Sequence, residues 1–235
     1  MLILSLALTF FAGGAGCAQP APRSTPPPGP ETEETRASLD EARRQLAARA
    51  DAVSDVLCSA RFMPIHDRTE FRELVRDHAP ASRITMASGD EPGERMVVFG
   101  EVREKDGTPA KNALVYLYHT SAKGWYSDKA AHISGNSGDT KHARLFGYVR
   151  TNGDGRFEVR TIRPAGYPET DLPAHIHFTI HVDRDRSLGG EIQFDDDPRL
   201  TPEWRARSKH EGTTIVPVER VKGGEQVVRA TFTLR

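Results

Sequence analysis

The chain has 235 residues, of which 28% are charged and 37% hydrophobic, and its formal net charge is -1. This length accommodates one substantial domain with appendages rather than two full domains. Lys and Arg are scattered along the sequence instead of gathering into a basic stripe, so the composition argues against nucleic acid as a partner.

Residues 1–17, MLILSLALTFFAGGAGC, are apolar and uncharged as far as Cys17. A segment of this length fits the hydrophobic region of a signal peptide better than a membrane span. Its end, GAGC, resembles the lipobox of bacterial lipoproteins, although the usual Leu is replaced by Gly14 and no basic residue precedes the apolar run. We expect export to the cell envelope, with Cys17 as the lipidation site and membrane anchor. Ordinary signal cleavage nearby is the alternative.

Residues 18–33 are Pro-rich, which predicts an extended linker. Residues 34–80 are expected to form a helical arm. Apolar residues recur at steps of three and four from Leu39 to Leu57, which predicts one amphipathic helix. We favour packing of this helix on its own domain; the alternatives are pairing with a partner helix and covering the edge of a sheet. A second, short helix is expected from Thr69, as its N-cap, to Pro80.

Cys58 is the only cysteine after Cys17, so the sequence predicts no internal disulfide. A free cysteine in a helix is more often a small buried apolar residue than a reactive thiol, and we favour the buried residue here.

From residue 94 to residue 235 the sequence changes to short runs rich in Val, Ile, Phe, Tyr and Thr, separated by turn signals such as KDGTP and TNGDGR. This spacing predicts a mainly β fold, an antiparallel β-sandwich preceded by the helical arm. The expected strands are MVVFGEVRE, ALVYLYHT, RFEVRTI, AHIHFTIHV, EIQFD, GTTIVPVE and VVRATFTL.

Histidines alternate with apolar residues in the run AHIHFTIHV. In a strand, His175 and His177 project side by side from one face, which suits a transition metal. Taken alone, such a pair is more often exposed or hydrogen-bonded than metal-bound. His181 lies roughly 13 Å beyond His177 at ~3.3 Å per residue, too far to bind the same ion, so we expect it to be structural or exposed.

Two tyrosine turns precede this strand, GWYS at Tyr126 and TIRPAGYP at Tyr167. Together with PAHIHF, and over roughly residues 98 to 195, the sequence resembles the intradiol ring-cleavage dioxygenases, the family of catechol 1,2-dioxygenase and protocatechuate 3,4-dioxygenase. The resemblance implies a mononuclear non-haem Fe(III) with four ligands, and a homo-oligomer. The ligands it implies are Tyr126, Tyr167, His175 and His177.

The same resemblance implies that O₂ opens the ring of a catechol-type aromatic diol to give a muconate-type product. Tyr167 is then the catalytic phenolate, which the substrate displaces and which accepts a proton. Phenolates are hard, anionic donors that favour Fe(III), whereas Zn or Cu is the alternative metal and Zn sites rarely recruit phenolate. Each tyrosine considered alone also fits a packing role, Tyr126 beside Trp125 and Tyr167 in a hydrogen-bonded turn.

Two positions depart from the family's pattern. The family usually has an Arg where Leu172 stands, and a Gln that aligns with Glu191 or, after a short shift, with Gln193. These three residues are candidates for substrate binding. Loss of a cation removes electrostatic stabilisation that can reach several kcal/mol in a dry site. Three other arginines are candidates to supply that charge: Arg144, Arg150 and Arg163.

The alternative function is a catalytically silent, transthyretin-like binding module of the envelope that keeps the fold. A relative that no longer bound a metal would be expected to lose these four ligand residues from its sequence. Their joint presence favours the enzyme.

Overall fold

The computed structural model describes residues 31–49, 51–127, 143–168, 170–183, 186–208 and 212–234. The predicted signal peptide, Cys17 and most of the predicted linker lie outside these ranges. None of the helices within these ranges is long and apolar enough to cross a membrane.

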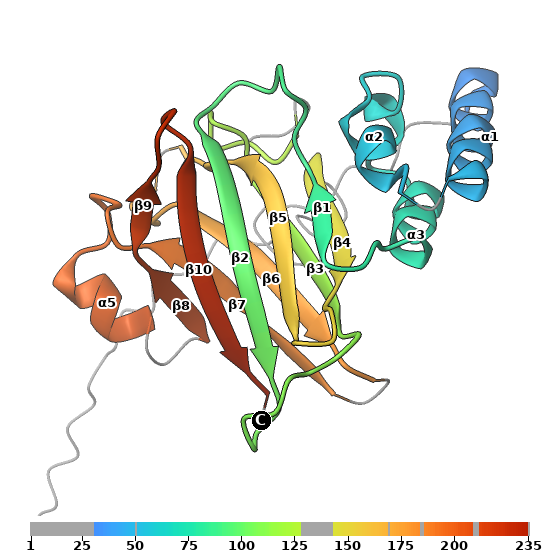
Figure 1. The fold of residues 1–235 in the computed structure, drawn as a ribbon. Coiled ribbons are helices and arrows are strands. Elements are labelled where there is room, and N and C mark those ends of the chain that lie inside the picture. Colours follow the sequence, from blue (N-terminus) through green and yellow to red (C-terminus); the bar gives the residue numbers. More distant parts are fainter. Residues whose placement is uncertain are drawn as a thin grey trace, which may run out of the picture.

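Two five-stranded sheets pack face to face and form the body of the protein (Figure 1). The mainly β class is confirmed. The pairing is mixed rather than wholly antiparallel, because residues 83–85 pair in parallel with 158–160, 226–233 with 96–103, and 191–194 with 213–216. In the first sheet the order is β1 (Arg83–Thr85), β5 (Arg156–Ile162), β2 (Arg95–Arg103), β10 (Gln226–Thr233) and β9 (Val218–Arg220). In the second it is β4 (Leu145–Arg150), β3 (Leu114–His119), β6 (His175–His181), β7 (Ser187–Phe194) and β8 (Thr213–Val216).

The core lies between the sheets, where alternate residues of each strand point inward. Phe178 of β6 lies against Phe232 of β10, with ring centroids 4.5 Å apart. Phe232 in turn stacks on Phe157 of β5 at 6.3 Å. Since Phe178 points into the core, the histidines that alternate with it in β6 point to the outer face of their sheet.

The helical arm consists of α1 (Glu33–Ala48), α2 (Val53–Cys58), a 3₁₀ turn (Met63–Ile65) and α3 (Thr69–Asp77). The prediction of one helix up to Leu57 is wrong, because Arg49 takes an extended conformation with φ -143° and ends α1. Thr69 is the first residue of α3 and Arg68 is the N-cap, so the predicted cap is also wrong. Three further elements were not predicted from the sequence: β1, β4 and α5 (Pro202–Ser208).

The arm joins the sandwich through Arg72, a buried cation on α3. Its guanidinium donates to the carbonyls of His66 at 2.9 Å and Ala143 at 3.0 Å, and to the hydroxyl of Tyr116 at 2.6 Å. It also lies 3.7 Å from the ring centre of Phe146. These contacts reach β3 and β4, so the arm packs on its own domain, as predicted.

Cys58 is half-buried at the end of α2, and its sulfur lies 3.6 Å from the carbonyl oxygen of Thr85. Burial raises the pKa of the thiol to about 11. The thiol is therefore protonated at neutral pH, as expected for an unreactive cysteine.

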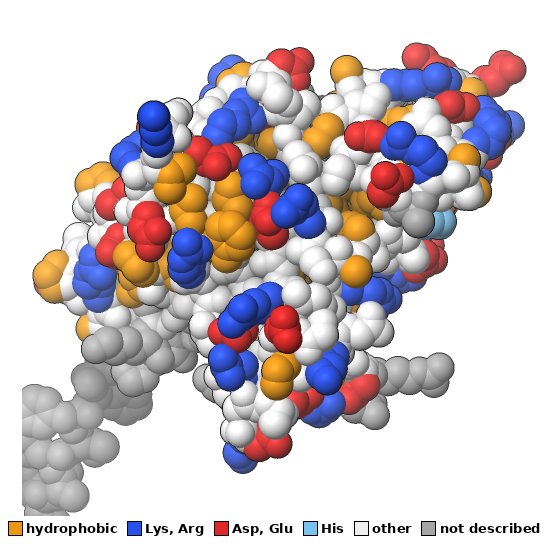
Figure 2. Space-filling view, in the orientation of Figure 1, with side chains coloured by type: hydrophobic (Ala, Val, Ile, Leu, Met, Phe, Trp, Pro, Cys, Tyr) orange, Lys and Arg blue, Asp and Glu red, His pale blue; other side chains and the backbone are white. Residues whose placement is uncertain are grey.

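Charged side chains of both signs are interleaved over the face that presents the first sheet (Figure 2). Glu158 of β5 pairs with Arg160 at 2.8 Å and with Arg83 at 3.1 Å. Phe99 is an exposed large apolar residue on this face, and the Arg229 guanidinium lies 5.0 Å from its ring centre. Such mixed charges are typical of a solvated surface.

Among the described residues outside the predicted ligand set, His66 and His119 are buried histidines. Burial lowers the pKa of both His66 and His119 to about 4, so each ring is neutral in the folded protein. His66 Nδ1 donates to the carbonyl of Arg144 at 2.9 Å, and its Nε2 has no hydrogen-bond partner in the part of the chain that the structure describes.

We predict that acid destabilises the fold partly through His66. The folded-state pKa of about 4 lies below the unfolded value of about 6.5, so the unfolded state binds more protons between them. The free energy of unfolding should therefore fall as the pH drops through this window, by about 3 kcal/mol for this ring. In urea unfolding at about pH 7 and about pH 4, His66→Leu should show a pH dependence smaller by that amount. His181→Leu, at an exposed position, should match the wild type, and an unchanged pH dependence in His66→Leu would contradict a neutral buried ring.

Candidate metal centre

Strand β6 places both histidines on one face of the sheet. Its register with β7 sets His175 opposite Gln193 and His177 opposite Glu191. Cross-strand partners project to the same side, so all four side chains share this face. His181, at the end of β6, is exposed, as predicted.

Tyr126 and Tyr167 reach the same face from two loops, one after β3 and one between β5 and β6. The loops meet at two glycines. Gly124 has φ +78°, and a Cβ added to it would overlap the carbonyl oxygen of Gly166. Each glycine lies within two residues of a tyrosine, so this close backbone contact sets the separation of the two phenols.

The four predicted ligands converge on one point. The Tyr167 hydroxyl lies 3.0 Å from His175 Nε2 and 3.4 Å from His177 Nε2. The Tyr126 hydroxyl lies 2.9 Å from His177 Nε2 and also contacts the Tyr167 hydroxyl. The two Nε2 atoms are 3.0 Å apart. Four donor atoms from three segments therefore surround one small volume.

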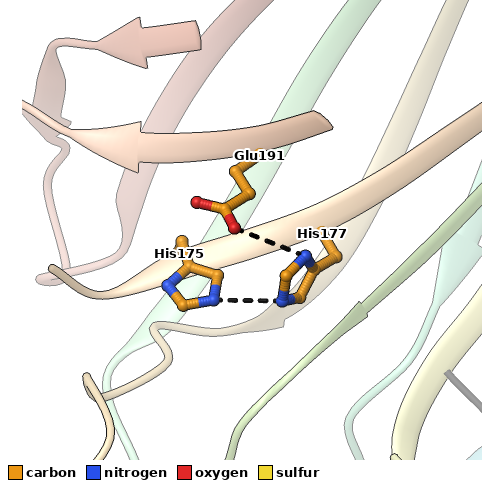
Figure 3. Close-up of side chains that lie close together, drawn as sticks. All are labelled: His175, His177 and Glu191. Atoms are coloured by element: carbon orange, nitrogen blue, oxygen red, sulfur yellow. Dashed lines mark hydrogen bonds and ion pairs between the residues drawn. The ribbon is translucent and has the colours of Figure 1, made fainter. Parts of the chain in front are cut away.

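The protonation states of the histidines fit a cation in this volume. His175 Nδ1 lies 2.8 Å from the carbonyl of Pro173 and donates to it, so Nε2 carries the lone pair. His177 Nδ1 lies 3.7 Å from a carboxylate oxygen of Glu191 (Figure 3), which favours a proton on Nδ1 there too. Both Nε2 lone pairs then face the same volume, where the Tyr167 and Tyr126 hydroxyls lie at hydrogen-bond distance and where a metal ion would bind both nitrogens. The residues present thus fit a metal ion with two imidazole and two phenol donors.

Glu191 and Gln193 lie beside the histidine pair. Ligand atoms of His175, His177 and Glu191 lie within 4.8 Å of one another. Gln193 Nε2 donates to the second Glu191 carboxylate oxygen at 3.2 Å, and the Ser208 hydroxyl of α5 donates to Gln193 Oε1 at 3.2 Å. The sequence left open which of the two residues reaches the site; both lie on its face, with Glu191 partly exposed and Gln193 buried.

Leu172 is partly buried and packs against the core, so it brings no charge to the site. Its carbonyl accepts a hydrogen bond at 3.2 Å from Arg199, a residue that sequence reasoning missed because no motif marks it. The three arginines proposed from the sequence are engaged elsewhere. Arg144 pairs with Glu91 at 2.6 Å, Arg163 with Asp196 at 2.6 Å, and Arg150 donates to the carbonyl of Asn112 at 3.3 Å.

We predict that Gly124→Ala lowers metal affinity by roughly 10-fold or more, because the added Cβ separates the two tyrosine loops. Gly107→Ala is the matched control, since Gly107 has φ +85° but an added Cβ would meet nothing within 4 Å. Gly107→Ala should lose about 1–2 kcal/mol of stability from the strained backbone, and Gly124→Ala should lose more, because its Cβ also forces the Gly166 carbonyl to move. Metal titration and urea unfolding measure the two effects. Equal metal affinity in the two variants would refute a role for the Gly124–Gly166 contact in the centre.

The dioxygenase family model Dioxygenase_C matches residues 71–235. Catechol 1,2-dioxygenase 1 of Acinetobacter lwoffii is 31% identical over 163 residues, 63% of this chain and 50% of that protein. The protocatechuate 3,4-dioxygenase beta chain of Burkholderia cepacia is 29% identical over 151 residues, 59% of this chain and 60% of that protein. The chain thus spans about half the length of the first of these relatives.

The fold is also similar to a solved structure. The crystal structure of catechol 1,2-dioxygenase from Pseudomonas arvilla C-1 aligns with a TM-score of 0.51 at 22% identity, covering 86% of this chain and 78% of that one. This likeness concerns the fold alone. The family match spans most of the chain and includes both tyrosine loops and the histidine strand, and the chain belongs to the intradiol dioxygenase family.

Proposed function

We propose that this chain is a mononuclear non-haem Fe(III) intradiol dioxygenase that uses O₂ to cleave a catechol-type aromatic diol to a muconate-type diacid. The observation that carries the proposal is the convergence of Tyr126, Tyr167, His175 and His177, in which the phenol and imidazole donors lie 2.9 to 3.4 Å apart. The names of the similar relatives, catechol and protocatechuate dioxygenases, support the substrate class.

Bound Fe(III) would supply Lewis acidity, a template for the two catechol oxygens and a charge that keeps the phenols ionised. The proposed reaction is balanced without a reductant. The bond between the two hydroxyl-bearing carbons breaks, and the two atoms of O₂ end in the two carboxyl groups of the product.

The side chains have distinct tasks in this proposal. Tyr167, on a loop rather than a strand, is the phenolate that gives way to the substrate and accepts a proton from a catechol hydroxyl. Tyr126 and the two histidines hold their positions. The ring of Tyr118 stacks on His177 with centroids 4.6 Å apart and fixes the plane of that imidazole. Tyr126 and Tyr167 are buried, so the donors are shielded from water.

The proposal is tested on the full chain loaded with iron. We expect about one iron per chain, a broad visible band from tyrosinate bound to Fe(III), and O₂ uptake with ring-opened product when catechol is added. Tyr167→Phe should weaken the band and lower turnover by roughly 100-fold or more while the fold stays intact. Tyr148→Phe is the control, because the Tyr148 ring stacks on Tyr116 with centroids 4.5 Å apart. This variant should keep the visible band and the turnover of the wild type.

An unchanged band in Tyr167→Phe would refute the ligand set. Colourless protein that takes up no iron would refute the enzyme and favour the envelope binding module.

We also propose that the protein is exported and anchored to a membrane through Cys17, where it would act on extracellular phenols. The apolar segment that ends in GAGC supports this location. Cys17→Ala should move the protein from the membrane fraction to the soluble fraction in cell fractionation, because the acyl chains are lost. Wild-type protein in the cytosol would contradict export. The expected homo-oligomer stays a prediction.

A further inference from the structure

Arg199 lies in the segment that follows β7 and reaches the loop that carries Tyr167. Its Nη1 donates to the carbonyl of Tyr167 at 3.3 Å and to the carbonyl of Leu172 at 3.2 Å. These carbonyls belong to the two ends of the Tyr167–Leu172 loop, and Leu172 is followed within a few residues by His175. One guanidinium nitrogen therefore closes the loop that connects a phenol ligand to the histidine strand.

The backbone is shaped to receive this guanidinium. A Cβ added to Gly166 would overlap Arg199 Nη1 and would lie 2.7 Å from the Leu172 carbonyl oxygen. A side chain at this position would thus displace the arginine. Two groups therefore lie close to Gly166: the Arg199 guanidinium, and Gly124 of the other tyrosine loop, which contacts the Gly166 carbonyl oxygen.

Asp197 ties the same segment to the start of the histidine strand. One of its carboxylate oxygens accepts the backbone N–H of Ala174 at 2.7 Å. The other accepts the backbone N–H of Arg199 at 2.8 Å. Since Ala174 directly precedes His175, the Asp197–Arg199 segment is bonded to both sides of the loop that joins Tyr167 to the histidines.

We propose that Arg199 and Asp197 are positioning residues of the metal centre, which hold the Tyr167 phenol at its distance from the two histidine Nε2 atoms. The metal-dependent part of this inference rests on the proposed function. Groups that orient metal ligands through hydrogen bonds typically contribute a factor of roughly 10 to 100 in metal affinity. Tyr167 needs such support more than the histidines do, because it comes from a loop, whereas β6 is paired on both sides.

The first test compares Arg199→Met with Arg199→Lys and Arg205→Met in the full chain. Arg205 is a matched control, since it donates to the carbonyl of Asp195 at 2.8 Å, near the same segment but away from the loop. We expect Arg199→Met to lower Fe(III) affinity by roughly 10- to 100-fold in chelator competition and to shift the tyrosinate band. Arg199→Lys, which keeps a cationic donor, should recover part of both losses, and Arg205→Met should lose neither.

The second test uses metal-free protein and measures hydrogen exchange at the Ala174 amide. Loss of the Arg199 contact should speed exchange by roughly 10-fold, because the loop opens more often, and Arg205→Met should not. Wild-type affinity and wild-type exchange in Arg199→Met would overturn the proposal, as would equal losses in Arg205→Met. If the wild type binds no iron but exchange is faster in Arg199→Met, the proposed function fails while the positioning role of Arg199 stands.

Discussion

The candidate centre depends on how closely two loops approach each other at Gly124 and Gly166. Neither tyrosine comes from a strand or helix, whereas both histidines come from β6, which is hydrogen-bonded on both sides. The site therefore has one half fixed by sheet register and one half fixed by loop contacts. A side chain at Gly124 would overlap the Gly166 carbonyl oxygen and push the two loops apart, so glycine is required at the contact.

The polar atoms of the centre also constrain one another. With Nδ1 of His175 committed to a carbonyl and Nδ1 of His177 beside a carboxylate, both Nε2 lone pairs point into a volume shared with two buried hydroxyls. In the metal-free protein each hydroxyl can donate to one Nε2 atom, and a bound cation would take the place of the two phenol protons. A metal ion bound at this centre would stabilise the fold as well as the site, since the unfolded chain offers no such arrangement.

Much of this arrangement was predictable from residues close in sequence. The alternation in AHIHFTIHV predicts that His175 and His177 share a face, because the strand period is two. The break after α1 at Arg49 was not predictable, since the apolar pattern continues beyond it to Val53 and Leu57 and no Gly or Pro marks the end of the helix. The role of Arg199 could not be predicted from the sequence either. Its partners, Tyr167 and Leu172, lie about thirty residues away, and nothing in DDDPRL signals that distant contact.

The helical arm takes part in shaping the centre. Arg72 of α3 donates to the Tyr116 hydroxyl, the Tyr116 ring stacks on Tyr118 at 5.4 Å, and Tyr118 stacks on His177 at 4.6 Å with an angle of 13°. A row of contacts thus runs from the arm across the outer face of β3 to the His177 imidazole of the candidate centre. Burying a guanidinium is costly unless its donors are satisfied, and here they bond the carbonyls of His66 in the arm and Ala143 before β4, and the Tyr116 hydroxyl of β3. The Tyr118 ring sets the plane of the His177 ring, and the arm in turn holds Tyr116, which stacks on Tyr118. The arm therefore contributes to the orientation of a side chain in the candidate centre.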